Sequence, residues 1–405
     1  MSKATRDRRG VASSETAREI NREVLLHAIH RHQPVSRADL ARITGLQPST
    51  VSVIIGQLIH DGWVVAGELG RLPRGRRPTF VKLNDRHVTL GIDLRPGRAN
   101  LAVVDISGKI LSREEIPFVH QGDARAEARE AILEVAKAAR ALRASHRGYV
   151  FDGVGVSVSG RVDQATHRAL FSPNAPWAEI DVHGELQRVL KSPIEMENAA
   201  NASVFAERWF GEFGGASHMI AVSVSEGIGT GLLVDGRLLR GRGDMAGEFG
   251  HMSIAESGPI CGCGNVGCWE TLASNRAGLR YYREFLPESN VATFRQLLDL
   301  ALAGDANALH AIDRMASYLA RGLAMLVAGL APEVIIIVGD FTALWSRIAP
   351  IIDSHLAAKS ISGHTPRVVP ALDGDAARLR GAAALVLHKA LFHHTEFSLV
   401  NRRAE

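Results

Sequence analysis

Three cysteines and one histidine have the residue types and the spacing of a metal site. Cys261, Cys263 and Cys268 lie close together in the chain, and His251 precedes them. Three thiolates and one imidazole match the ligand set of tetrahedral zinc, and the glycines between the cysteines allow a short loop to wrap an ion. Because the protein supplies all four ligands and leaves no position open for water, we predict a structural zinc ion.

Two other interpretations of the cysteines exist. A disulfide between Cys261 and Cys263 would be strained by their short separation and would leave Cys268 without a partner. The second alternative is that all three are inert buried thiols. An odd number of clustered cysteines is more typical of a metal site than of a disulfide framework.

The basic residues are concentrated near the N-terminus. Residues 1–86 contain fifteen Lys and Arg against eight Asp and Glu, an excess of seven, so in a chain of net charge +4 the remainder carries −3. This distribution predicts a small nucleic-acid-binding module on a larger, mildly acidic body. A solvated basic tail is the alternative.

The length of 405 residues favours two or three domains, because single cores rarely grow that large. No apolar segment follows the basic start as a secretory signal would require. The most apolar stretch, 322–338, is interrupted by Pro332 and Glu333, which indicates a helix and a buried strand rather than a membrane span. We therefore expect a cytoplasmic protein without a membrane partner.

The basic module has the pattern of a helix-turn-helix. A first helix is predicted over 16–32, and a second begins at Ser36, carries Leu40 and Ile43 inward and ends at Gly45. A third begins at Pro48 with an apolar inner face. Its outer face holds small side chains that would let it approach base edges, namely Ser49, Thr50, Ser52 and Val53.

Two predicted strands, 63–68 and 79–83, follow the third helix and argue against a plain three-helix bundle. Their connection is a Gly/Pro loop with four arginines, which can contact phosphates or enter a narrow minor groove. We therefore predict a winged helix-turn-helix that binds double-stranded operator DNA. The predicted contacts are Arg37, Gln47, Ser49, Thr50 and Ser52 from the helices and Arg71, Arg74, Arg76 and Arg77 from the wing.

The remaining chain alternates strands and helices. Three strands are predicted within 88–116, a helix over 124–144 and a strand over 153–158, and a similar set begins at residue 219. A helix followed by a strand is predicted within 311–339. Such repetition indicates an α/β body with two lobes, and a cleft between lobes usually binds a small ligand.

These motifs resemble the ROK family (repressor, open reading frame, kinase). The similarity is most specific over 247–251 with 261–270, and it extends to the segments 155–163, 172–177, 197–201, 226–231, 373–376 and 381–383. The N-terminal runs 35–41, 44–46, 49–52 and 75–78 resemble the DNA-binding module of ROK regulators of the xylose or N-acetylglucosamine repressor type.

The resemblance implies an actin-like, hexokinase-type body in a homodimer or higher homo-oligomer. We expect a DNA-binding domain over 1–70, with the wing and linker reaching about residue 86, and a sugar-binding domain over 87–405. The first lobe would comprise about 87–196 plus the C-terminal helix, which would pack back on it. The second lobe would comprise about 197–380.

The resemblance also implies which residues hold sugar hydroxyls. Carboxylates and amides can make paired hydrogen bonds to adjacent hydroxyls, although each acidic residue taken alone could equally be a solvated surface group. His251 would bind zinc through one ring nitrogen and face the sugar with the other. The implied sugar-binding residues are Gly160, Arg161, Asn174, Asn198, Glu248, His251 and Glu270.

Two features of ROK sugar kinases are missing from this chain. Their Asp-x-Gly-Gly-Thr phosphate loop corresponds here to 93–98, where Arg95 adds bulk and Pro96 removes a backbone donor. The kinase base that follows the asparagine of an Asn-Asp pair corresponds to Ala199. Losing a general base costs about 10²–10⁴ in rate. Residues 338–341 also replace the paired glycines often found near the nucleotide base.

We therefore predict a sugar-responsive repressor of carbohydrate-utilisation genes without kinase activity, whose effector is a sugar or a sugar phosphate. The main alternative is an ATP-dependent sugar kinase, glucokinase-like, with an attached DNA-binding module. A third possibility is a body that docks a protein of a transport system.

Overall fold

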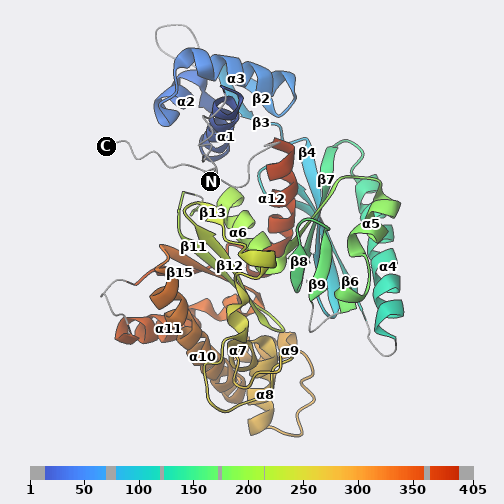
Figure 1. Ribbon diagram of the computed structural model, residues 1–405, viewed down its shortest axis with the longest axis vertical. Coiled ribbons are helices and arrows are strands. Elements are labelled where there is room, and N and C mark those ends of the chain that lie inside the picture. The colour runs from blue at the N-terminus through green and yellow to red at the C-terminus, as the bar shows by residue number, and fades with distance from the viewer. Residues whose placement is uncertain are drawn as a thin grey trace, which may run out of the picture. The chain divides into compact units, whose positions relative to one another are not determined.

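The computed structural model describes residues 14–69, 79–118, 123–171, 176–213, 215–359 and 365–391 (Figure 1). These residues form two compact units that divide between residues 87 and 88, with 389–391 assigned to the first unit. Within these ranges, no helix combines the length and the apolarity that crossing a membrane requires.

The first unit is a winged helix. Its three strands form one antiparallel sheet in the order β1-β3-β2. Its elements in chain order are α1 (Ser14–His32), β1 (Val35–Ser36), α2 (Arg37–Thr44), α3 (Pro48–His60), β2 (Val64–Leu69) and β3 (Thr79–Leu83).

Local signals explain the helix boundaries of this unit. The Ser36 hydroxyl accepts a hydrogen bond from the Asp39 amide at 3.1 Å, and Gly45 ends α2 with a φ of 70°. Pro48 occupies the first turn of α3. The expectation that Ile43 points inward is wrong, because its side chain is 45% exposed in the last turn of α2. Leu40 is the residue that α2 buries.

The second unit contains two five-stranded sheets built on one plan, which explains the repeated sequence pattern. Each sheet has a three-stranded antiparallel meander followed by two further strands. The first sheet has the order β10 (Ile194–Asn198), β7 (Val150–Val158), β4 (His87–Leu94), β5 (Arg98–Asp105) and β6 (Ile110–Pro117). The second has the order β15 (Arg367–Pro370), β14 (Val334–Val338), β11 (Met219–Val224), β12 (Ile228–Val234) and β13 (Arg237–Leu238).

Helices cover both sheets. On the first sheet, α4 (Ala124–Ser145) and α5 (Val182–Leu190) pack on one face and α12 (Ala377–Leu391) on the other (Figure 1). The second sheet has α6 (Ala199–Phe210) on one face. Its other face is covered by helices of the set α7 (Trp269–Ala273), α8 (Asn275–Phe285), α9 (Phe294–Leu302), α10 (Ala306–Leu330) and α11 (Trp345–Lys359).

Short elements complete the second unit. The first lobe adds a two-stranded ribbon and the one-turn helix η1, and the other one-turn helices follow later in the chain. The short elements are β8 (Arg161–Asp163), β9 (Arg168–Phe171), η1 (Pro176–Glu179), η2 (Arg242–Asp244), η3 (Glu248–His251), η4 (Asp340–Leu344) and η5 (Gly374–Ala376).

Glycines let α12 approach the first sheet closely. A Cβ atom added at Gly155 would lie 1.8 Å from the carbonyl oxygen of Ala382, and one at Gly91 would lie 2.8 Å from that of Leu379. No side chain fits at such separations. The last helix, α12, therefore packs directly on the first sheet. The two-lobed α/β body is as expected.

Candidate functional site

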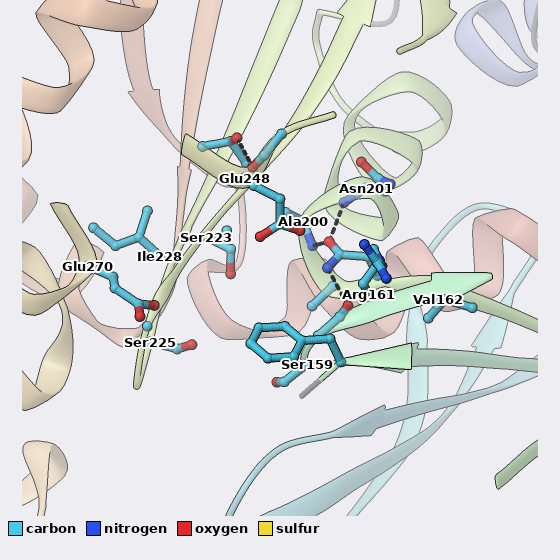
Figure 2. Close-up of a pocket in the computed structure, with 18 of the residues that line it drawn as sticks. Ser159, Arg161, Val162, Ala200, Asn201, Ser223, Ser225, Ile228, Glu248 and Glu270 are labelled. Atoms are coloured by element: carbon cyan, nitrogen blue, oxygen red, sulfur yellow. Dashed lines mark hydrogen bonds between the residues drawn. The ribbon is translucent and has the colours of Figure 1, made fainter. Parts of the chain in front are cut away.

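A pocket lies between the two lobes of the second unit. Its walls come from 159–162 in the first lobe, 197–201 at the start of α6, the β11–β12 hairpin at 223–230 and the segment 244–251 (Figure 2). The space measures about 910 Å³ when its solvent-filled opening is included. A cavity of this kind suits a small ligand held by a few polar groups.

The structure brings together six of the seven predicted sugar-binding residues in this pocket. They are Gly160, Arg161, Asn198, Glu248, His251 and Glu270. Figure 2 shows Glu248 and Glu270 on one side and Arg161 on the other. Asn174 lies outside the described residues.

The acidic wall carries Glu248 and Glu270. Burial raises the pKa of Glu248, and the charges of His251 and Arg161 oppose that rise. Glu248 Oε2 lies 3.6 Å from Nε2 of His251, whereas Glu270 Oε1 lies 3.5 Å from Nδ1 of the same ring. The two carboxylates and the imidazole thus form one polar surface that can pair with adjacent hydroxyls.

Asn198 is held rigidly by hydrogen bonds within the protein. Its Oδ1 caps α6 by accepting from the amides of Ala200 and Asn201, and its Nδ2 donates to the carbonyl of Gly160 at 2.6 Å. A carboxamide nitrogen has two N–H donors, so one remains for a ligand. Asn198 can therefore act as a preorganised donor at the floor of the pocket.

The predicted metal ligands converge at the edge of the pocket. The ligand atoms of His251, Cys261, Cys263 and Cys268 all lie within 4.8 Å of one another. Zn–S and Zn–N bond lengths predict tetrahedral edges of about 3.8 Å between sulfurs and about 3.6 Å between sulfur and nitrogen. The observed separations are 3.7 Å for Cys263 Sγ to Cys268 Sγ and 3.4 Å for Cys261 Sγ to His251 Nδ1. The cluster therefore fits a tetrahedral metal ion.

The chemistry of the cluster agrees with its geometry. Burial raises the pKa of the Cys268 thiol to about 11 and also raises the pKa of Cys261, so neither thiol ionises readily by itself. A metal ion stabilises thiolates and is the natural compensation for such a site. All three cysteines are free of disulfides.

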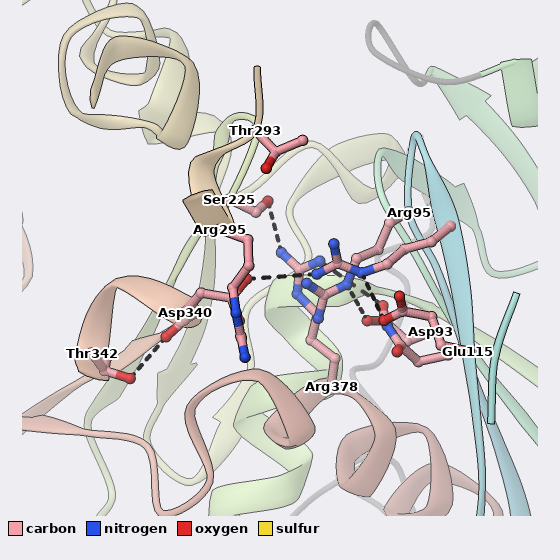
Figure 3. Close-up of polar contacts among 12 residues, drawn as sticks. Asp93, Arg95, Glu115, Ser225, Thr293, Arg295, Asp340, Thr342 and Arg378 are labelled. Carbon is pink, nitrogen blue, oxygen red and sulfur yellow. Dashed lines mark hydrogen bonds and ion pairs between the residues drawn. The ribbon is translucent and has the colours of Figure 1, made fainter. Parts of the chain in front are cut away.

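A buried ion pair lies at the turn between β4 and β5, beside Pro96 of the pocket wall. Arg95 is only 4% exposed and its Nε donates to Oδ2 of the fully buried Asp93 at 2.6 Å (Figure 3). Arg95 N also donates to Arg98 O, which leaves only Pro96 and Gly97 in the turn between β4 and β5. The turn between these two strands is therefore short and holds a proline.

Sequence reasoning missed a second arginine at this place. Arg378, 3% exposed at the start of α12, donates to the hydroxyls of Ser223 and Ser225 at 2.6 Å and 2.9 Å. Its Nη1 lies 3.9 Å from Asp93 Oδ1, so Arg378 connects both lobes. No local pattern marks this residue, because its serine partners lie more than 150 positions away in the chain.

Two further pocket residues were also missed as site residues. Phe171 meets His251 edge to face with ring centroids 6.5 Å apart, and its ring is partly exposed to the pocket. Glu197 is buried and accepts a hydrogen bond from Arg240 at 2.7 Å. The position of Glu197 directly before Asn198 could have identified it as a pocket residue, whereas nothing in the sequence around Phe171 indicated its place in the pocket.

The predicted DNA-contacting residues of the helices lie on the surface of the first unit. Arg37, Gln47, Ser49 and Ser52 are exposed and Thr50 is half-buried. Val53 on the same outer face is 58% exposed. The four wing arginines Arg71, Arg74, Arg76 and Arg77 lie outside the described residues.

The chain is similar to known families in both units. Residues 89–389 match the ROK family and residues 24–77 match the MarR family. The xylose repressor of Bacillus subtilis is 28% identical over 93% of this chain and 97% of that protein. A glucokinase of Thermotoga maritima is 31% identical over 69% of this chain and 89% of its own length.

Solved structures show the same fold. A ROK family transcriptional regulator described as a homologue of the E. coli MLC protein superposes with a TM-score of 0.73 at 23% identity, over 93% of this chain and 97% of that one. A ROK family glucokinase from Streptomyces griseus, in complex with glucose and AMPPNP, has a TM-score of 0.65 at 28% identity, over 74% and 98% of the two chains. The regulator aligns with residues of both units, whereas the glucokinase aligns with about three quarters of the chain.

Proposed function

The chain belongs to the ROK family, and from this premise we propose that it is a sugar-responsive transcriptional repressor of carbohydrate-utilisation genes. The winged helix binds operator DNA, and the pocket between the lobes of the second unit binds the effector. The full-length similarity to xylose repressors supports this assignment over that of an enzyme.

One observation carries the proposal that kinase activity is absent. The pocket keeps the groups that pair with hydroxyls, namely Asn198, Glu248 and Glu270, while Ala199 occupies the position of the base. The Asp93–Arg95 ion pair fills the place of the phosphate loop. A site that binds sugar but lacks both parts of the phosphoryl-transfer machinery suits a receptor.

The competing assignment is a sugar kinase with an attached DNA-binding unit, and similarity to glucokinases motivates its test. Purified full-length protein is incubated with ATP, magnesium and xylose, glucose or N-acetylglucosamine, and ADP release is followed. We expect no release above the sugar-free background. Sustained turnover that disappears in an Asn198→Ala variant would establish the kinase instead.

Effector binding and DNA binding are tested on the same protein. A sugar that binds the pocket at one hundred times its Kd should stabilise the folded chain by about 2.7 kcal/mol. The same sugar should change the mobility shift of a promoter fragment, because effector binding favours one lobe arrangement and thereby changes the spacing of paired recognition helices. A DNA affinity that ignores every sugar would instead favour a transport-system protein as the effector.

We further propose that His251, Cys261, Cys263 and Cys268 hold one structural zinc ion. When bound, the ion supplies positive charge that stabilises the three thiolates and joins the cysteine loop to η3. This would orient the His251 ring so that Nε2 faces Glu248 and the pocket. We also propose a cytoplasmic homodimer or higher homo-oligomer, which size measurement with and without operator DNA tests.

A further inference from the structure

A second groove lies on the first lobe and is distinct from the pocket between the lobes. Because α4 leads into β7 and α5 leads into β10, and these two strands are parallel, both helices end at the same edge of the first sheet. The groove lies there, between the last turns of the two helices and the segment 146–151. Its space measures about 1120 Å³ when its solvent-filled opening is included. Among the described residues, the groove and the pocket share no lining residue.

The walls of this groove, which we call the basic groove, carry four permanent cations. They are Arg140, Arg143, Arg147 and Lys191, and none of the described residues that line the groove is Asp or Glu. A helix C-terminus carries about −0.5 charge, so the two helix ends balance about one of the four cations and leave an excess of about +3. This local charge is opposite to that of the chain after residue 86, which is −3.

The cations at the rim of the basic groove are not used by the protein. Arg140, Arg147 and Lys191 are exposed, and their side chains have no carboxylate or hydrogen-bond partner among the described residues. One unpaired cation is ordinary on a protein surface, whereas three around one groove produce a local positive potential. Lys191 also ends α5 with a φ of 48°, in the left-handed region that glycine adopts without strain. The chain therefore places a cation at a position where the backbone favours glycine.

The inner wall of the basic groove is held in place by contacts within the protein. Arg143 Nη1 donates to Ser192 Oγ at 2.5 Å, and Arg143 Cζ lies 5.5 Å from the centroid of the Phe151 ring. A guanidinium has five N–H donors, so donors remain for an anion. Tyr149 is 39% exposed, and the centroid of its ring lies 5.9 Å from that of His146. The groove thus combines a fixed guanidinium with an aromatic surface that can contact an organic group.

We propose that the basic groove binds a phosphate monoester. The phosphate carries a charge of about −1.5 to −2 near neutral pH and pairs with the rim cations Arg140, Arg147 and Lys191. Arg143 donates to it from the inner wall, and the organic part of the ester lies on Tyr149. DNA phosphates would use the same cations but would leave the aromatic surface without a role. This ligand site is additional to the proposed effector pocket and does not rest on the proposed function.

The test uses full-length protein in phosphate-free buffer of low ionic strength. The protein is titrated calorimetrically with phenyl phosphate, inorganic phosphate and benzyl alcohol. We expect phenyl phosphate to bind, inorganic phosphate to bind about threefold or more weakly because it lacks the aromatic group, and benzyl alcohol not to bind. Arg147→Ala and Lys191→Gly should each weaken phenyl phosphate binding by about threefold or more, because each removes a charged donor to the phosphate.

Lys137→Ala is the control for net charge, because Lys137 is an exposed cation of α4 that does not line the groove. It should leave the affinity for phenyl phosphate unchanged. Lys191→Gly also separates binding from folding, because glycine suits the left-handed backbone and should not lower the melting temperature. If Lys137→Ala weakens binding as much as the groove variants do, only net charge is involved and the site is wrong. Phenyl phosphate that does not bind at all would also overturn the site.

The remaining outcomes assign the basic groove to another ligand. Inorganic phosphate that binds as tightly as phenyl phosphate would overturn the role of Tyr149. Binding of polyglutamate in place of phenyl phosphate would indicate an acidic protein segment as the ligand. Groove variants that weaken promoter binding but leave phenyl phosphate binding unchanged would indicate DNA. None of these results contradicts the proposed repressor, because sugar titration tests that function separately.

Discussion

His251 links the predicted metal centre to the predicted sugar site through a single ring. Its Nδ1 lies 3.4 Å from Cys261 Sγ, and its Nε2 lies 3.6 Å from Glu248 Oε2. A metal-bound imidazole has a fixed ring orientation and a fixed tautomer. Loss of the metal ion should therefore disturb the position of the His251 ring in the pocket as well as the fold of the cysteine loop.

We predict that Cys263→Ser abolishes stoichiometric zinc. A tetrahedral site that loses one thiolate loses most of its affinity, because a hydroxyl is a poor ligand for this ion. Metal analysis of purified protein measures the content, and sugar titration measures the pocket. Val266→Ala is the control, because it changes a partly exposed side chain in the same loop. A Cys263→Ser protein with full zinc would show that the ligand set is wrong.

A second prediction concerns the buried carboxyl of Glu207 in α6. Burial raises its pKa above the ordinary value, and hydrogen bonds from the Phe213 and Glu212 amides only partly offset this. A group with a raised pKa in the folded state contributes stability at low pH and loses it as the pH rises through that pKa. Melting temperatures from pH 4 to pH 7 should therefore favour Glu207→Gln increasingly over wild type. A constant difference across this range would contradict the shift.

At the scale of elements, caps and close approaches determine where helices begin and how they pack. Ser36 and Gly45 bound α2, and Asn198 caps α6 at the pocket floor. Glycines in β4 and β7 allow α12 to pack closely against the first sheet. A single substitution can test a helix cap or a close contact of this kind.

Ser36→Ala should destabilise the first unit by about 1 kcal/mol, which is typical for loss of an N-cap. The hydroxyl accepts from the Asp39 amide and donates to its carboxylate at 2.7 Å. These contacts also lower the pKa of Asp39, and a depressed carboxyl pKa makes the stabilisation disappear as the pH falls through it. Chemical denaturation at pH 7 and pH 3 should thus give a smaller effect at the lower pH. Ser36→Thr, which keeps a capping hydroxyl, should recover most of the loss.

Gly155→Ala should destabilise the second unit by about 1–3 kcal/mol, because the new methyl group meets the Ala382 carbonyl. Gly329→Ala is the matched control in α10, where the added Cβ meets nothing within 4 Å. That change should stabilise the chain by up to about 1 kcal/mol, because alanine favours helix more than glycine does. Urea unfolding of both variants checks the contrast, and equal effects would refute the packing argument.

At the scale of the whole molecule, the charge is distributed unevenly between the two parts of the chain. The basic N-terminal segment suits binding to an anionic polymer, whereas the acidic body contains a pocket for a small ligand. The two sheets of the second unit share one strand order, so the pocket forms where two similar lobes face each other.

Replacing the four wing arginines by alanine should weaken operator binding and its salt dependence together. Each arginine that neutralises a phosphate contributes about 0.9 to the slope of log K against log salt. Titrations of a promoter fragment at several salt concentrations measure both quantities. Arg295→Ala, which removes an exposed guanidinium from the second unit, should leave the slope unchanged. Loss of affinity without a change of slope would show that the wing does not contact phosphates.

Much of this molecule was predictable from local sequence patterns. The capped helices around Ser36 and Pro48, the alternating strands and helices of the body and the Cys₃His spacing are local or nearly periodic signals. The family resemblance added the pocket residues that stand in contiguous motifs, such as Asn198 and Glu248. The burial of Ile43 was predicted wrongly, because periodicity does not show where a helix leaves the core.

Only the tertiary structure decided which distant residues meet. Arg378 reaches Ser223, Ser225 and Asp93 because α12 crosses between the lobes, and no spacing in the chain encodes that meeting. Glu226 Oε2 is buried without a hydrogen-bond partner among the described residues, which is equally invisible in sequence, since a partner is present or absent only after folding. The physical reason is that local propensity acts over a few residues, whereas burial and charge pairing depend on the packing of the entire chain.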